Sequence, residues 1–177
     1  MPTPWVTTVR EDVVTRLVAA GTAAGSRVYS WRTTPLEAGD LPAIVVRSGL
    51  DRSTTAQRSG VAVESVNIVI ECYVEGSTDA VVAANSDALE EQVFLALWND
   101  ATWTNQDELM RVEPQPADAL DINVESAKRR GRAVQAWKLT RARVQTPTTT
   151  GDALSLLVAS IHIRPDEDLD ATVEVAL

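Results

Sequence analysis

The sequence predicts an α+β domain, with a mostly antiparallel mixed sheet and two main helices packed on one face. Two stretches have apolar residues at the three- and four-residue spacing of an amphipathic helix. Several other stretches have the two-residue alternation of strands that bury one face. These elements follow in the order helix, strands, helix, strands, without an internal repeat, so we expect the helices to cover the buried face of the sheet.

The two helices are expected from about Pro4 to Ala20 and from about Asp79 to Trp98. Thr3 and Pro4 can begin the first helix, and Gly21 can end it. The apolar side of this helix comprises Val6, Val9, Val13 and Leu17. Residues 76–79 supply caps for the second helix. Its apolar stripe comprises Val82, Leu89, Val93, Ala96 and Leu97.

The clearest strand is expected over Val63–Val74. One of its faces carries Val66, Ile68, Ile70 and Cys72. The other face carries Ser65, Asn67, Glu71 and Tyr73, with Val69 as the one exception, and is expected to be wetter. Further strands are expected at Arg27–Trp31, Ala43–Arg47, Leu120–Glu125, Val134–Gln145 and Leu154–Arg164.

Other segments are expected to be irregular. The polar segment Gly49–Gly60 lies between two strands and is interpreted as either a long hairpin loop or a mobile arm. Pro114 and Pro116 argue against a long regular element between residues 101 and 119. We expect a single domain over residues 1–177, with 165–177 as an extended C-terminal tail that can add an edge strand in an assembly.

Composition excludes several classes of protein. The net charge of -9 gives no general attraction to nucleic acid phosphates. The single cysteine, Cys72, excludes an intramolecular disulfide and a four-cysteine zinc site, and the single histidine, His162, weakens any zinc or Ser-His-Asp proposal. The sequence has no apolar run long enough to span a membrane and no features of a signal peptide. We therefore expect folding in a reducing cytoplasm and no membrane partner.

Sequence motifs for catalysis are absent. There is no glycine-rich phosphate loop, no His-Glu-x-x-His motif and no nucleophile elbow around a serine. His162 is interpreted as a sheet residue and Cys72 as a small core residue. The acidic cluster at residues 166–170 lacks EF-hand spacing and is interpreted as a solvated turn. We expect no enzyme activity, cofactor or metal; a pair of catalytic carboxylates among the 25 acidic residues is left open.

The polar segment Gly49–Gly60 and the basic turn at residues 128–132 are the candidate interaction sites. The turn carries four cations in five residues and is interpreted as a charged hairpin tip or as a contact with an acidic neighbouring subunit. Non-specific contact with passing DNA is the alternative, although the turn has no aromatic residue that could stack on bases. The residues predicted to contact a neighbouring protein are Arg52, Arg58, Lys128, Arg129, Arg130 and Arg132. The five tryptophans are expected in the core: Trp5, Trp31, Trp98, Trp103 and Trp137. One or two of them can instead anchor a subunit interface.

One segment resembles a known family. Residues 39–46, Gly-Asp-Leu-Pro-Ala-Ile-Val-Val, are similar to the strand entry of phage tail terminator proteins, the minor tail protein U family of lambda-type long-tailed phages. The order of elements around this segment also resembles that family, with a helix before it and a polar loop, an alternating strand and a second helix after it. The resemblance spans roughly Val9 to Trp98, and the chain is longer than the family after Trp98.

The resemblance implies a structural virion protein at the head-proximal end of the tail, assembled in the host cytoplasm. It implies a hexameric ring that stacks on the tail-tube protein, stops tube polymerisation and presents a surface to the head–tail connector proteins. A small domain with one sheet can close such a ring through head-to-tail contacts. Other neck, tail-completion or tail-tube subunits remain alternatives, as does a small ligand-binding or enzymatic α+β domain with a deep polar pocket.

Overall fold

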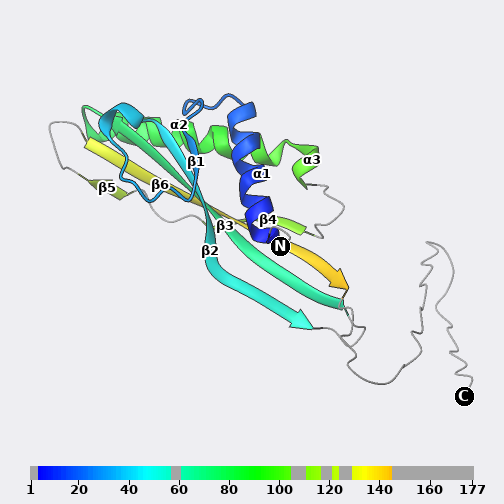
Figure 1. Ribbon diagram of the computed structural model, residues 1–177. Helices are drawn as coiled ribbons and strands as arrows, with labels where there is room; N and C mark the ends of the chain where they lie inside the picture. The colour runs from blue at the N-terminus through cyan, green and yellow to red at the C-terminus, as the bar shows by residue number, and fades with distance from the viewer. Residues whose placement is uncertain (1–3, 57–60, 105–110, 117–120, 124–128, 145–177) are drawn as a thin grey trace, which may run out of the picture. The chain divides into compact units, whose positions relative to one another are not determined.

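The computed structural model describes residues 4–56, 61–104, 111–116, 121–123 and 129–144 (Figure 1). The helical elements are α1 (Trp5–Ala19), η1 (Ala38–Asp40), α2 (Asp79–Trp98) and α3 (Ala101–Thr104). The strands are β1 (Val28–Ser30), β2 (Ala43–Ala56), β3 (Val61–Gly76), β4 (Arg111–Gln115), β5 (Asp121–Asn123) and β6 (Arg129–Val144).

Both main helices form where the apolar spacing predicts them. In α1 the buried residues are Val9, Val13 and Leu17, and Gly21, with a φ of 65°, follows its end. Thr78 caps α2, because its side-chain oxygen accepts a hydrogen bond from the backbone nitrogen of Val81 at 3.2 Å. The cap expected from Thr3 lies outside the described residues. The buried residues of α2 are Val82, Ser86, Leu89, Val93 and Leu97.

The strands form one sheet in the order β1-β2-β3-β6-β4, with β5 also paired to β6. β1 and β2 are parallel, and every other pairing is antiparallel. This arrangement confirms the predicted α+β class with a mostly antiparallel mixed sheet. The two outermost strands of the path, β1 and β4, are both short, which limits the unpaired edge that each presents.

Both helices cover the same face of the sheet. The register pairs Ile44 of β2 with Cys72 of β3, and Cys72 with Ala133 of β6, so these three side chains point to one face. All three belong to a single buried cluster that also contains Val13 of α1 and Val93 of α2. The face that Cys72 shares with Val66, Ile68 and Ile70 is therefore the buried one, as predicted, and Cys72 is a core residue.

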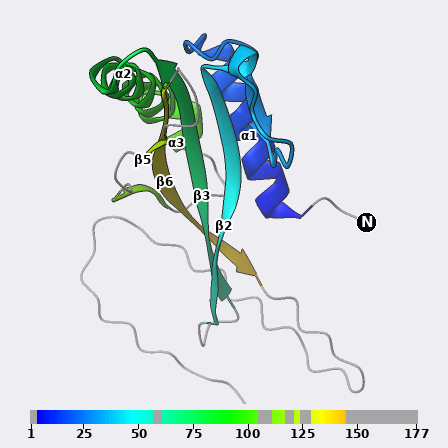
Figure 2. The ribbon, with the colours of Figure 1, turned by 90° about the vertical axis from the view of Figure 1, so that its left-hand side faces the viewer.

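The polar segment after Gly49 continues a strand, so the prediction of a loop or arm was wrong for residues 49–56. β2 runs to Ala56, which pairs with Ala62 of β3, and the register shifts between Ser48 and Arg52. Polar composition suggested a loop, but backbone pairing between strands does not require apolar side chains. In Figure 2 the far ends of β2, β3 and β6 extend past both α1 and α2.

The region after α2 is more regular than expected. It contains α3, the short strand β4, and β5, which lies within the strand expected at residues 120–125; residues 120, 124 and 125 lie outside the described part of the chain. Pro114 lies inside β4, opposite Trp137. β4 is an edge strand of the described sheet, with no described strand paired to its outer side. An edge strand tolerates proline because it does not need backbone N–H donors on both sides.

Two tryptophans contradict the prediction that all five lie in the core. Trp103 and Trp137 are buried, and Trp5 packs partly buried against the core cluster. Trp31 and Trp98, in contrast, are 46% and 48% exposed. Large aromatic side chains at the surface of a monomer are typical of interaction sites, so these two are the ones available as interface anchors.

Several predictions fall on residues that the structure does not describe. They are the strand at residues 154–164 with His162, the acidic cluster at 166–170 and the C-terminal tail at 165–177. The described residues belong to the unit Met1–Thr146, and the single domain over 1–177 stays a prediction. Of the helices described, none is long and apolar enough to cross a membrane.

Candidate functional site

Three of the predicted basic residues lie together at the beginning of β6. Because β6 begins at Arg129 and pairs there with Gly76, the residues Arg129, Arg130 and Arg132 are part of the sheet, and the prediction of a basic turn was wrong for them. The dense positive charge suggested a solvated turn, but long cationic side chains extend to the surface from a strand just as well.

The other predicted basic residues are not brought to this cluster by anything the structure describes. The backbone of Arg52 lies in β2 opposite Val66, and its side chain lies outside the described part of the chain. Arg58 and Lys128 also lie outside it. Their assignment to a subunit or tail-tube interface stays a prediction.

The three described arginines are held by partners within the chain. The Nη1 atom of Arg129 lies 2.5 Å from an oxygen of Asp79, the first residue of α2. The Nη1 atom of Arg130 donates to the backbone oxygen of Leu36 at 3.2 Å. Arg130 therefore ties β6 to the segment between β1 and β2, and Arg129 ties it to α2.

Glu71 is the centre of the polar cluster on the face of the sheet away from the helices. Its side chain is only 5% exposed. Arg132 donates to Oε1 of Glu71 at 2.5 Å, the Nε atom of Arg47 lies 3.0 Å from Oε2, and the Tyr73 hydroxyl donates to Oε2 at 3.1 Å. The expectation that this face is wetter was therefore wrong at Glu71, which is buried because two arginines on flanking strands satisfy it.

The same contacts shift two neighbouring pKa values. The hydrogen bond to the Glu71 carboxylate raises the pKa of Arg132, which favours its charged form. Burial, together with the negative charge of Glu71, raises the pKa of Tyr73. Both shifts keep Tyr73 a protonated donor and Arg132 a cation, so the cluster has a fixed pattern of charge at neutral pH.

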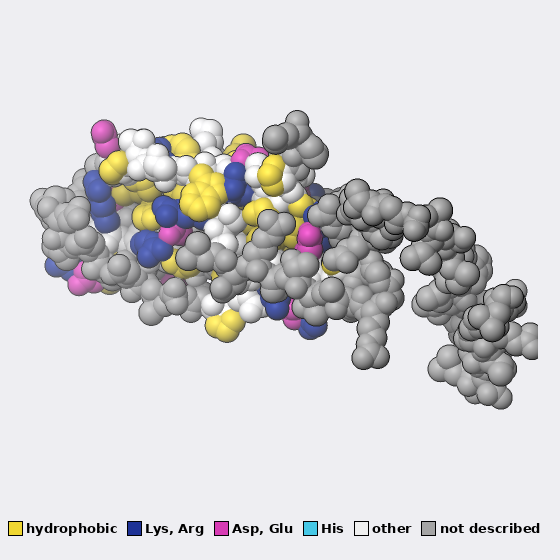
Figure 3. Space-filling view, turned by 60° about the horizontal axis from the view of Figure 1, so that its bottom comes forward, with side chains coloured by type: hydrophobic (Ala, Val, Ile, Leu, Met, Phe, Trp, Pro, Cys, Tyr) yellow, Lys and Arg dark blue, Asp and Glu magenta, His cyan; other side chains and the backbone are white. Residues whose placement is uncertain are grey.

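Arg47, Tyr73 and Arg132, which contact Glu71, line a pocket of about 360 Å³. Its wall is formed on one side by the segment 32–36 and on the other by β2, β3 and β6. Its cationic lining residues are Arg32, Arg47, Arg130 and Arg132. Figure 3 shows Lys and Arg side chains gathered toward the left of the face turned forward, next to hydrophobic ones. A pocket with this lining can hold an anionic group.

The chemistry available in the pocket is charge pairing. Arg32 already donates to Oδ2 of Asp40 at 2.7 Å, and two of the other arginines pair with Glu71. Within the described residues there is no group of three His, Cys, Asp or Glu that could hold a metal ion. The thiol of Cys72 is buried on the opposite face of its strand, and burial raises its pKa to about 12.

Sequence reasoning found the basic end of β6 but missed its partners. Arg47 and Glu71 lie in expected strands, and only the register between β2 and β3, together with that between β3 and β6, brings them near Arg132. A glutamate inside a valine- and isoleucine-rich strand was the available signal, since a carboxylate there needs a cation opposite it. Arg32 gave no signal, because it lies in an irregular segment.

Comparison with known proteins gives little further information. No family model matches the chain, and no curated protein matches it. A solved structure titled "Virion of native gene transfer agent (GTA) particle" contains a chain that is similar at 20% identity and a TM-score of 0.48. The similarity covers 78% of this chain and 99% of that chain. We draw no functional conclusion from a likeness of this size.

Proposed function

We propose that this protein is a structural virion subunit, a tail terminator that caps the tail tube as a hexameric ring and forms the surface for the head–tail connector proteins. The observation that carries the proposal is the terminator-like segment at residues 39–46 in the expected order of helices and strands, although residues 49–56 after it form a strand where a polar loop was expected. The segment begins in η1 and leads into β2, after α1 and before β3 and α2. No enzyme activity, cofactor or metal is part of the proposal.

The sheet supports a ring on physical grounds. Its two outer strands, β1 and β4, lie on opposite sides of β2, β3 and β6, and the surfaces beside them differ. A contact between two unlike surfaces is heterologous, and repeated heterologous contacts close into a ring when the rotation between subunits allows it. The ends of β2, β3 and β6 beyond the helices offer a further surface to the tail tube (Figure 1).

The basic residues have a defined part in this proposal. The side chains of Arg129 and Arg132 are 37% and 43% exposed, so each has donors left for an outside partner after pairing within the chain. We assign them, with Arg130, Arg52, Arg58 and Lys128, to contacts with a neighbouring subunit or the tail tube. Passing DNA can make non-specific contact with the same cations.

Loss of the protein from its phage tests the terminator role. Particles that lack it are expected to have overlong tails that fail to join heads, since nothing stops polymerisation of the tube. Electron microscopy of the lysate measures tail length, and a plasmid copy of the gene is expected to restore it. Tails of normal length that remain separate from heads would instead identify a neck or tail-completion protein, and the terminator proposal would be wrong.

The arginine-lined pocket favours a second candidate, a binding domain for a small anion. Calorimetric titration with inorganic phosphate and with small dicarboxylates tests it, with Arg47→Ala as the variant that removes one cation from the lining. Saturable binding that the variant loses would support this candidate. Absence of binding at millimolar ligand would remove it.

A further inference from the structure

A protruding tryptophan marks the β1 edge of the sheet. Trp31 directly follows β1 and is 46% exposed, and its backbone nitrogen donates to the oxygen of Val46 at 3.1 Å. Its φ of 51° is in the left-handed region, which is unfavourable for a bulky residue of this type. The fold therefore holds an exposed indole in a strained conformation at one fixed place.

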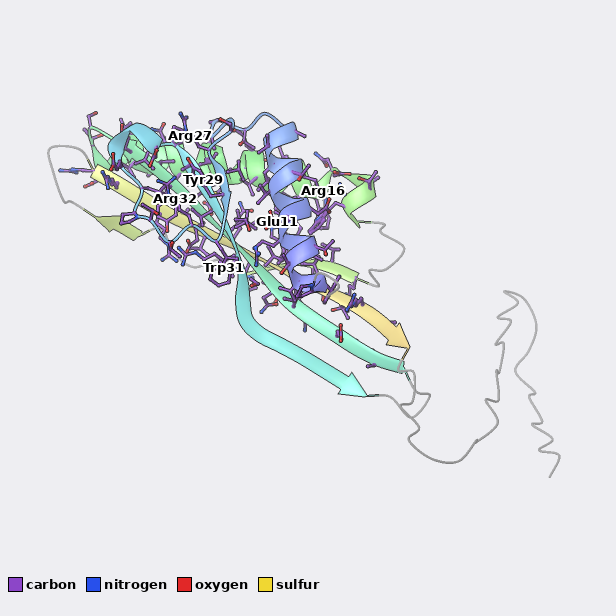
Figure 4. All side chains as sticks on the ribbon, in the orientation of Figure 1. Glu11, Arg16, Arg27, Tyr29, Trp31 and Arg32 are labelled. Carbon is purple, nitrogen blue, oxygen red and sulfur yellow. The ribbon has the colours of Figure 1, made fainter. Side chains whose placement is uncertain are left out.

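Arg10 lies beside this tryptophan, and Arg32 follows it in the chain. The guanidinium carbon of Arg10 lies 5.7 Å from the centre of the Trp31 ring, and its Nε atom donates to Ser30 at 2.7 Å. Arg32 stacks on Tyr29 with its guanidinium carbon 4.5 Å from the ring centre. In Figure 4 Tyr29 and Arg32 lie close to one another, and Trp31 lies lower in the view. The segment 27–36 contains Arg27 and Arg32 and no acidic residue, but two carboxylates lie beside it: Glu11 is 3.5 Å from Arg10, and Asp40 is 2.7 Å from Arg32.

An acidic groove with aromatic walls lies at the other edge of the sheet. It has a volume of about 500 Å³ and runs between α2 and the paired strands β4 and β6. Phe94 and Trp137 form its aromatic part, with ring centres 5.7 Å apart. Its described lining includes the carboxylates Asp87, Glu90 and Glu91 and no Lys or Arg.

Within the described part of the chain, no lysine or arginine pairs with the three carboxylates of the groove. Burial and the neighbouring carboxylate of Asp87 raise the pKa of Glu90, so the two negative charges disfavour one another. A cation placed in the groove would relieve this repulsion. Trp137 is buried behind Phe94, so an aromatic ring that enters the groove would contact the partly buried Phe94, which stacks on the exposed Trp98 with ring centres 5.7 Å apart.

We propose that Trp31, flanked by Arg10 and Arg32, docks into the groove between α2 and β4 of a second copy of this chain. The Trp31 surface has a small net positive charge, since Arg10, Arg27 and Arg32 stand against Glu11 and Asp40, whereas the described lining of the groove has only negative charges. The groove, at about 500 Å³, has room for an indole ring. Because the two surfaces lie at opposite edges of one sheet, every copy can give its tryptophan to one neighbour and receive another's. The inference rests on the proposed function, since it assigns the contact that closes the ring.

The contact makes up only part of an interface. A buried tryptophan contributes about 150–250 Å², whereas a standard interface buries about 800 Å² on each partner. Trp31 is therefore proposed as the central anchor of a larger interface, and the arginines and carboxylates around it orient the two copies relative to one another. Loss of such an anchor weakens binding by about 2 kcal/mol or more, which is roughly 30-fold or more in the dissociation constant.

Disulfide trapping with full-length protein tests the pairing directly. Trp31→Cys and Glu91→Cys are made separately, and the buried Cys72 does not interfere. When the two variants are mixed under mild oxidation, a disulfide between positions 31 and 91 of different copies is expected. Trp31→Cys mixed with Ser77→Cys, at an exposed position beside α2, is the matched control. A dimer of Trp31→Cys with itself would indicate a two-fold contact and overturn the proposal.

Analytical ultracentrifugation measures how much the contact contributes to association of the copies. The wild-type protein is expected to form oligomers, whereas Trp31→Ala and Glu91→Lys shift toward the 19.1 kDa monomer at the same concentration. Val81→Ala, which truncates another exposed apolar residue of α2, is expected to behave as wild type. Circular dichroism and the urea midpoint confirm that each variant folds.

The outcomes separate this contact from the proposed function. No disulfide above the control level, or an oligomer that persists unchanged in Trp31→Ala, overturns the assigned contact even if the deletion phage has overlong tails. Normal tails in the deletion phage overturn the terminator role whatever the disulfide experiment gives.

Discussion

Arg132 reaches diagonally across the sheet to Glu71: its backbone pairs with Tyr73, yet its guanidinium donates to the Glu71 carboxylate at 2.5 Å. Arg47 reaches the same carboxylate from the other neighbouring strand. One buried acidic residue thus links β2, β3 and β6 on the face that the helices leave open. The arginine pocket depends on this residue, because Glu71 holds two of its four cations in place.

Replacement of Glu71 with glutamine is expected to lower the free energy of unfolding by about 1–3 kcal/mol, because two arginines and a tyrosine lose their shared acceptor charge. Urea denaturation measures the change. Glu113→Gln is the matched control, since Glu113 pairs with Arg111 at the surface, 32% exposed, and should cost less than about 0.5 kcal/mol. Equal effects of the two substitutions would contradict the central role of Glu71.

The tryptophans separate into core and surface residues by their effect on stability. Trp137→Ala is expected to lower the free energy of unfolding by about 3–5 kcal/mol, because Trp137 is 1% exposed and fills the space beneath α2. Trp98→Ala, at a 48% exposed position, should cost less than about 1 kcal/mol. Chemical denaturation followed by circular dichroism compares them, and a small effect at Trp137 would contradict the packing described for the core.

Asp100 is expected to make stability depend on acidic pH. Hydrogen bonds from Thr102, followed by the contact with Arg16, lower its pKa from 3.8 to about 2. Since the folded-state pKa lies below the unfolded one, the stabilisation is complete above about pH 4 and is lost as the pH falls toward 2. Asp100→Ala should cost about 1 kcal/mol at pH 7 through the lost cap of α3.

The pH dependence of that difference provides the check. Urea midpoints of wild type and Asp100→Ala at pH 7, 4 and 3 should converge as the pH falls. A difference that stays constant over this range would show that the charge of Asp100 does not stabilise the fold.

Cys72 should react with thiol reagents only after unfolding. The residue is fully buried and its pKa is raised to about 12, so little thiolate exists and access is closed. At pH 8 we expect labelling of the native protein to be at least about 100-fold slower than labelling in urea. Ser77→Cys adds an exposed thiol that should label quickly, and fast labelling of the wild type would contradict the burial of Cys72.

Much of the fold could be predicted from the sequence because the apolar spacing is strong. The stripe of α2 and the alternation of β3 each depend on residues that are buried in the structure. The continuation of β2 through residues 49–56 could not be predicted, since polar residues there pair through the backbone and leave no apolar pattern. β4 was missed for a related reason, because the edge position that permits Pro114 is a property of the whole sheet.

The candidate site was predicted only in part. Dense charge identified the cations at the start of β6, but their partners lie on other strands and at Leu36 in an irregular segment. The exposure of Trp31 could not be predicted from the sequence, because tryptophan is highly buried on average. The exposure of Trp31 depends on the register between β1 and β2 and on the positive φ of Trp31. The spacing of apolar residues along the sequence predicts neither of them.

The separation of β1 and β4 by three strands gives any assembly built through these two edges a direction. In the proposed contact, a row of copies that has not yet closed would end in an undocked Trp31 on one side and an empty groove on the other. A short soluble peptide that copies residues 27–36 would occupy only the empty groove. It would therefore halt growth at a single terminus, whereas a symmetric dimer would offer it no vacant position.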